Sequence, residues 1–168
     1  MQDTGIFYSF RSVKTGQQVK KIIKLLGNDQ AETVDVDVVT RDQFMKFTNF
    51  ILAVPTWFDG ELPNYWDEFL PAIEDEDLKG KNFAIFGGGD QKGYPENFVD
   101  GIGLMTEFIE ERGGNVVGYT STDGYEFEGS RSQRGDQFTG LALDIENQAA
   151  LSNERIEKWV ESLRKDFE

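Results

Sequence analysis

Apolar and polar positions alternate along the chain with two different periods, which predicts strands and helices in turn. Between the apolar runs, residues such as Val19, Ile22, Ile23 and Leu26 recur at helical spacing. Strand and helix alternate through five strands, so we predict an α/β fold with a doubly wound parallel sheet in one domain covering residues 1–168. The expected strands lie at residues 5–8, 33–39, 50–54, 82–86 and 116–119.

The expected helices follow from the same spacing and from their end signals. Glycines close the first helix and the fourth, proline suits the start of the third, and serine caps the last. The helices are expected up to about Gly27, over 40–47, from Pro63, from Phe98 to Gly113, and from Ser152 onward.

The fifth strand is followed by an unusual stretch. Residues 121–139 are polar and rich in glycine, and an apolar run then resumes at 140–143. We interpret this as a strand interrupted by an insertion of about 20 residues, which is long for a loop without structure of its own.

Two loops after strands carry residues suited to a flat ligand. Pro55 ends the third strand and Trp57 follows at once, while 87–89 is a run of three glycines followed by Asp90 and Tyr94. Parallel strands end at one edge of the sheet, so these loops are expected to lie together there. Taken alone, Trp57 would serve equally well as a cover for the core.

The loop after the first strand, residues 9–16, is rich in hydroxyls and opens a helix. Backbone N–H groups and hydroxyls at a helix start favour a phosphate, although ordinary N-capping explains the same residues. The loop matches neither the P-loop pattern nor GxGxxG, so it does not indicate a nucleoside triphosphate or a dinucleotide.

Composition narrows the possible functions. The 168 residues include no cysteine and no histidine, which excludes disulfides, Cys/His zinc sites, iron–sulfur clusters and histidine-based triads. Redox work would therefore need a bound cofactor. The net charge of −14 argues against binding to nucleic acid or to anionic membranes and favours basic partners. With no leading signal segment or bilayer-length apolar run, we expect a cytoplasmic protein.

Four segments together resemble one known family. They are PTWFDGEL at 55–62, GDQKGYPENF at 89–98, STDGYEF at 121–127 and GLALDIENQ at 140–148. The chain resembles the long-chain flavodoxins over its whole length, and the cyanobacterial and algal members most. The resemblance implies a flavodoxin-like sheet of order 2-1-3-4-5, non-covalently bound FMN, and a low-potential electron carrier that is not an enzyme. It also identifies the insertion as the loop that distinguishes long-chain members.

The resemblance also implies which residues bind FMN. Trp57 and Tyr94 would cover the two faces of the flavin ring, and Asp90 would contact its pyrimidine edge. No catalytic or metal-binding residue is expected. The implied FMN-binding residues are Ser9, Phe10, Arg11, Ser12, Val13, Lys14, Thr15, Pro55, Thr56, Trp57, Phe58, Asp59, Gly60, Gly88, Gly89, Asp90, Tyr94, Asn97 and Glu146.

The phosphate loop departs from the family pattern T-x-T-G-x-T. Phe10 removes one hydroxyl and Val13 replaces a glycine. We expect Arg11 to offset this change if it folds toward the phosphate. An alternative alignment matches Thr15 and Gly16 to the T-G pair but needs a three-residue insertion, so we prefer the alignment without gaps.

The expected partners of a monomeric carrier are basic redox proteins, namely ferredoxin-NADP reductase, photosystem I and ferredoxin-dependent reductases. An acidic run without lysine or arginine supports steering toward such partners, although it also aids solubility. An FMN-dependent quinone reductase of related fold is the alternative. A signalling receiver module is a third class, but it needs paired carboxylates where Ser9, Phe10 and Arg11 stand. The acidic run comprises Asp59, Glu61, Asp67, Glu68, Glu74, Asp75, Glu76 and Asp77.

Overall fold

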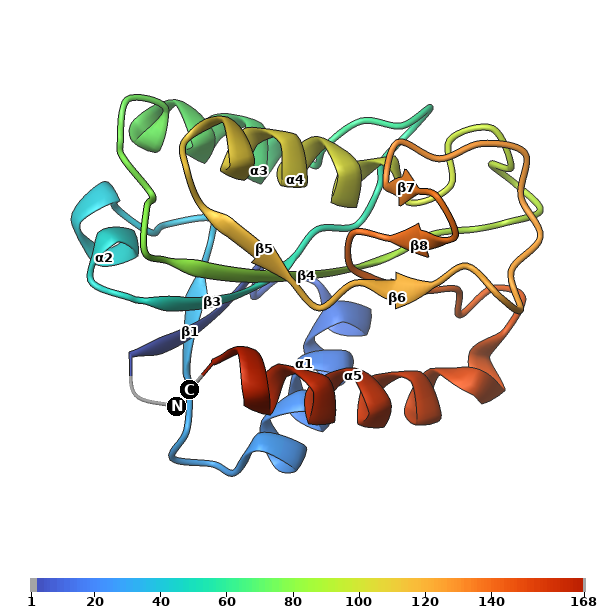
Figure 1. Ribbon diagram of the computed structural model, residues 1–168, viewed down its shortest axis with the longest axis horizontal. Helices are drawn as coiled ribbons and strands as arrows, with labels where there is room; N and C mark the ends of the chain where they lie inside the picture. The colour runs from blue at the N-terminus through green and yellow to red at the C-terminus, as the bar shows by residue number, and fades with distance from the viewer. Residues whose placement is uncertain (1–2, 168) are drawn as a thin grey trace.

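The computed structural model describes residues 3–167 and contains a twisted parallel sheet with helices on both faces (Figure 1). The strand order is β2-β1-β3-β4-β5, with β9 also paired to β4. This order confirms the predicted doubly wound fold. The strands of the sheet are β1 (Thr4–Tyr8), β2 (Glu32–Asp35), β3 (Asn49–Ala53), β4 (Asn82–Gly88), β5 (Asn115–Val117) and β9 (Leu141–Leu143).

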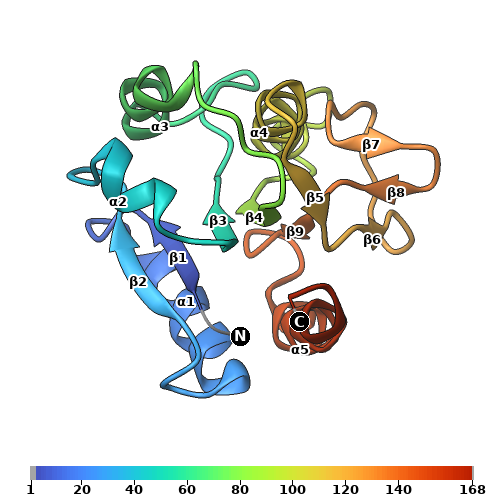
Figure 2. The same cartoon turned by 60° about the vertical axis from the view of Figure 1, so that its left-hand side comes forward.

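The helices divide between the two faces of the sheet. Figure 2 shows α1 and α5 on one face, with α3 and α4 on the other. Successive residues of a strand point to opposite faces, so Phe50 belongs to the apolar cluster under α2, α3 and α4 and Ile51 to the cluster under α1 and α5. The helices are α1 (Val13–Leu26), α2 (Arg41–Met45), α3 (Asn64–Phe69), α4 (Asp100–Glu111) and α5 (Ser152–Asp166), with 3₁₀ turns at Leu70–Ile73 and Ala149–Leu151.

Strand β4 changes its neighbour halfway along. Asn82 to Ala84 pair with β5, and Phe86 to Gly88 pair with β9. The chain leaves the sheet after β5 and returns at Gly140, where a side chain would meet the carbonyl oxygen of Ile85 at 2.2 Å. The predicted interruption of the fifth strand is therefore confirmed.

The excursion between β5 and β9 has structure that the sequence pattern did not indicate. It forms a small antiparallel sheet of β6 (Thr120–Ser121), β8 (Gln137–Phe138) and β7 (Gln133–Arg134). Strands of two residues are too short to show a period. The fully buried Phe138 anchors this sheet by packing against Phe98, Tyr125 and Phe127.

Several predicted boundaries were wrong: β5 ends at Val117 and not at residue 119, and α4 begins at Asp100 and not at Phe98. Two others have a local explanation. Strand β2 ends at Asp35 and not at residue 39, because the Asp35 carboxylate accepts the N–H of Asp37 and its carbonyl accepts the N–H of Val38. Ser152 is the first residue of α5 and not its cap, since the 3₁₀ turn ending at Leu151 precedes it. Within residues 3–167, no helix has the length and apolarity needed to cross a membrane.

Candidate functional site

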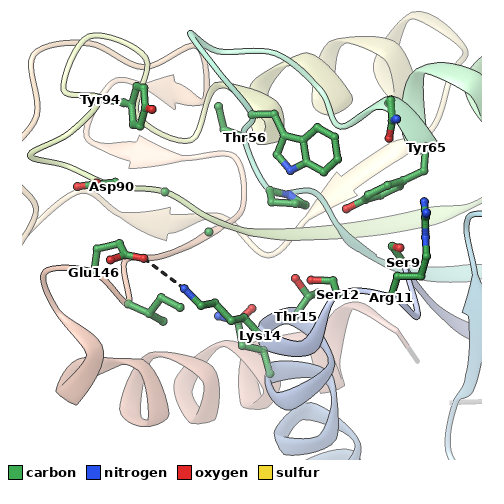
Figure 3. Close-up of a pocket in the computed structure, with 17 residues that line it drawn as sticks. Ser9, Arg11, Ser12, Lys14, Thr15, Thr56, Tyr65, Asp90, Tyr94 and Glu146 are labelled. Carbon is green, nitrogen blue, oxygen red and sulfur yellow. Dashed lines mark hydrogen bonds and ion pairs between the residues drawn. The ribbon is translucent and has the colours of Figure 1, made fainter.

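A cavity of about 760 Å³ opens at the edge of the sheet where the parallel strands end (Figure 3). Loops after β1, β3, β4 and β9 surround it, together with the starts of α1 and α3. Its walls are formed by Ser9, Arg11, Ser12, Lys14, Thr15, Gln18, Pro55, Thr56, Trp57, Asn64, Tyr65, Gly88, Gly89, Asp90, Tyr94, Ile145 and Glu146.

The structure brings most of the predicted site residues to this cavity but leaves six outside its walls. Phe10 is 51% exposed and its ring packs tilted against that of Tyr8 with a centroid distance of 4.8 Å, and Val13 faces solvent. The predicted residues that do not line the cavity are Phe10, Val13, Phe58, Asp59, Gly60 and Asn97.

Four wall residues were missed by the sequence reasoning. Gln18 lies three residues after Thr15 on α1, so helical spacing places it on the same face. Tyr65 lies on the apolar face of α3 and also borders the cavity. The remaining two residues, Asn64 and Ile145, carried no signal of their own.

The start of α1 forms the polar end of the cavity. Ser12 stands at the N-cap, yet its side chain makes no capping hydrogen bond, and the first turn contains no acidic residue. The hydroxyls of Ser12 and Thr15 both point into the cavity (Figure 3). Unpaired N–H groups and the helix dipole make such an end favourable for an anion. Because α1 begins at Val13, Thr15 and Gly16 lie inside the helix, which agrees with the alignment without gaps.

The outer side of the same loop is held by two carboxylates, one at the end of β2 and one just after it. Asp37 accepts hydrogen bonds from Ser9 Oγ at 2.6 Å and Arg11 Nη2 at 2.7 Å, and Asp35 accepts the N–H of Phe10 at 3.2 Å. Burial alone would raise the pKa of Asp37, but these hydrogen bonds keep that pKa below its ordinary value. Arg11 is thus paired at the rim and is not directed at the start of α1 as we expected.

The aromatic walls come from the loops after β3 and β4. Trp57 and Tyr94 are 36% and 48% exposed, whereas most large rings of the chain are buried. The ring of Tyr65 packs edge-on against Trp57 at 5.8 Å. Two exposed rings bordering one cavity suit a planar ligand, because stacking removes apolar surface from water.

A tight turn follows Trp57. Trp57 and Glu61 exchange two backbone hydrogen bonds of 2.8 Å, so three residues close the turn. Phe58 adopts a φ of 50°, which costs a bulky residue about 1–2 kcal/mol. Gly60 has a φ of 95° and lies so close to α4 that a side chain would meet Asp100 Oδ2 at 2.6 Å.

The loop after β4 is shaped by Asp90. Its carboxylate accepts the N–H of Gly93 at 2.9 Å, the side chain of Asn147 at 2.8 Å and the N–H of Lys92 at 3.1 Å. The bond from Gly93, followed by that from Asn147, lowers the pKa of Asp90 below its ordinary value. Across the mouth, Lys14 and Glu146 form an exposed ion pair of 3.4 Å (Figure 3).

A buried carboxylate ties the loops together. Asp144 is fully buried and accepts four N–H groups, two from Gln91 at 3.0 and 2.7 Å and two from Asn147 at 3.0 and 2.9 Å. Gln91 in turn accepts the N–H of Glu126 at 2.6 Å. The loop after β4, the end of β9 and the excursion are therefore connected through one hydrogen-bonded network.

The arrangement combines two exposed rings with an anion-binding helix start in one cavity, which suits a planar aromatic group carrying a phosphate. Among residues 3–167, no group of three acidic side chains is placed to hold a metal ion.

Comparison with known proteins gives a consistent match. The flavodoxin family model matches residues 6–159. A flavodoxin of a Nostoc species is 41% identical over 163 residues, covering 97% of this chain and 96% of the relative. Flavodoxin 1 of Escherichia coli K12 is 39% identical over 168 residues, covering 99% and 96%. The structure of Fusobacterium nucleatum flavodoxin bound to flavin mononucleotide aligns with a TM-score of 0.93 at 36% identity and covers all of both chains.

Proposed function

Because the chain belongs to the flavodoxin family, we propose that it binds FMN and carries electrons between other proteins. The observation that carries this proposal is the meeting of the uncapped start of α1 with the exposed rings of Trp57 and Tyr94 in one cavity. A group with a phosphate at one end and a flat ring system at the other satisfies both features.

The residues present fit this cofactor. Ser12, Thr15 and the first N–H groups of α1 would hold the phosphate. Trp57 and Tyr94 would cover the ring and exclude water from it, and the Asp90 loop would border its polar edge. When bound, FMN supplies a ring that accepts and returns one or two electrons.

The walls formed by Trp57 and Tyr94 also favour electron carriage over catalysis of a reaction on a small substrate. If both faces of the ring are covered by Trp57 and Tyr94, a small substrate such as a quinone has no space to stack on it. Electrons would then pass only through the exposed edge of the ring, and a partner protein would dock there.

The proposal is tested by the visible absorption of the purified protein and by reconstitution of the flavin-free form. We expect a flavin spectrum, tight binding of FMN, much weaker binding of FAD, and reversible reduction by dithionite. A colourless protein that takes up no FMN would contradict the function. Turnover of quinone with NADPH as the only other component would favour the quinone reductase.

We further propose basic redox proteins as partners, with ferredoxin-NADP reductase, photosystem I and ferredoxin-dependent reductases as candidates. The acidic run supports this proposal, because seven of its eight side chains are exposed and only Glu76 is partly covered, where it bonds Arg41. Asp59 and Glu61 lie in the turn after Trp57, and Asp67 and Glu68 lie on α3 beside the cavity.

Reduction by a basic reductase is therefore expected to slow as salt rises, since exposed charges are screened beyond about 8 Å at physiological ionic strength. Neutralising the site-side charges with Asp67→Asn and Glu68→Gln should lower the rate at low salt and flatten its salt dependence. Glu157→Gln, on the exposed surface of α5, is the matched control and should leave the rate unchanged. Rates independent of ionic strength in the unaltered protein would show that the acidic run serves solubility alone.

A further inference from the structure

Tyr65 is a buried residue whose hydroxyl opens into the proposed FMN cavity and has no hydrogen-bond partner among residues 3–167. The residue is only 5% exposed, and its hydroxyl points into the cavity where Ser12 and Thr15 also point (Figure 3). Within residues 3–167 this hydroxyl makes no hydrogen bond, whereas the hydroxyl of the partly buried Tyr125 donates to the carbonyl of Ala142 at 2.6 Å. Tyrosine hydroxyls in such surroundings usually have a partner, so the free one is informative.

The loop between β1 and α1 lies opposite Tyr65, and few of its side chains are free to bind an anion. Phe10 has no hydroxyl and its ring is turned outward onto Tyr8. Ser9 and Arg11 both bond Asp37 on the outer side of the loop. The side-chain hydroxyls of this loop that remain free to meet a ligand are those of Ser12 and Thr15.

We propose that the Tyr65 hydroxyl donates a hydrogen bond to the phosphate of bound FMN and so replaces, from the opposite wall, the hydroxyl that Phe10 lacks. This inference rests on the FMN-binding function proposed above. It adds a phosphate contact from α3, outside the loop between β1 and α1 that the sequence identified as the phosphate site.

The surroundings of Tyr65 keep the hydroxyl in its donating form. Burial and, to a smaller extent, the negative charge of Asp37 raise the pKa of Tyr65, while the charge of Arg11 acts weakly in the other direction. The phenol therefore stays protonated at neutral pH and faces the phosphate as a donor. The edge-on contact with Trp57 fixes the ring, so little side-chain freedom is lost when the bond forms.

The test compares FMN with riboflavin, which lacks the phosphate, on flavin-free protein carrying Tyr65→Phe. The substitution keeps the ring against Trp57 and removes only the hydroxyl. We expect the dissociation constant of FMN to rise roughly 10- to 100-fold, as for a lost hydrogen bond to a charged group, and that of riboflavin to change less than threefold. Tyr119→Phe, outside the cavity, is the control and should alter neither constant.

A second substitution tests the replacement itself. Phe10→Thr in the Tyr65→Phe background should recover most of the lost FMN affinity, and in the unaltered background it should gain much less. Equal losses of FMN and riboflavin in Tyr65→Phe would place the hydroxyl on another part of the flavin and overturn the proposal, as would unchanged FMN affinity. If the unaltered protein bound neither flavin, the proposed function would fail as well, so the two failures are distinguishable.

Discussion

Replacing Asp144 with alanine is expected to lower the free energy of unfolding of the flavin-free protein by about 2–5 kcal/mol. Asp144 is fully buried and receives four N–H groups from Gln91 and Asn147. Alanine removes the acceptor and leaves the two N–H groups of the buried Gln91 without this partner, whereas Asn147 is exposed and its side chain also bonds Asp90. The cost comes from desolvated donors as well as from the lost bonds, which is why it exceeds that of a typical polar substitution.

Urea unfolding of the flavin-free protein measures this effect, because bound flavin would add its own stabilisation. Asp123→Ala is the matched control, since Asp123 is exposed and its carboxylate makes no hydrogen bond within the described residues; we expect a change within about 0.5 kcal/mol. If Asp144→Ala cost no more than this control, the network would not hold the loops.

The second large effect is expected at the aromatic walls. Trp57→Ala and Tyr94→Ala should each weaken FMN binding by about 1–3 kcal/mol, or roughly 5- to 150-fold, through lost stacking and burial. Riboflavin should lose affinity by a similar factor, because the rings act on the flavin and not on the phosphate. Recovery of flavin fluorescence on dilution measures both ligands.

Leu151→Ala provides the control for the aromatic substitutions, since Leu151 is 41% exposed and lies outside the cavity. It should leave flavin affinity unchanged. Full FMN affinity in both aromatic variants would refute the sandwich and would reopen the ring to a small substrate.

Features set by local pattern could be predicted from the sequence. Apolar runs marked the strands, and the alternation with helices determined the topology. Trp57 and Tyr94 were predicted to lie together because each follows a parallel strand, and such strands end at one edge. The interruption of the fifth strand was visible because an apolar run resumes at Leu141.

Features set by residues distant in the sequence could not be predicted from it. Arg11 was expected to turn inward, but its direction is decided by Asp37, which lies 26 residues away. Asp144 looked like any residue at a strand end, because its donors belong to other loops. Tyr65 combines an apolar ring with a hydroxyl, and periodicity registers only the ring. Each of these side chains is positioned by contacts that no local pattern contains.

The switch of partner along β4 has a consequence in terms of chain entropy. The cost of closing a loop rises with the logarithm of its length, so doubling the excursion between Val117 and Leu141 would cost only about 0.6 kcal/mol. Lengthening the three-residue turn after Trp57 would instead break its paired hydrogen bonds with Glu61. The fold can therefore grow where β4 changes partner, while the turn that borders the cavity is held to its present length.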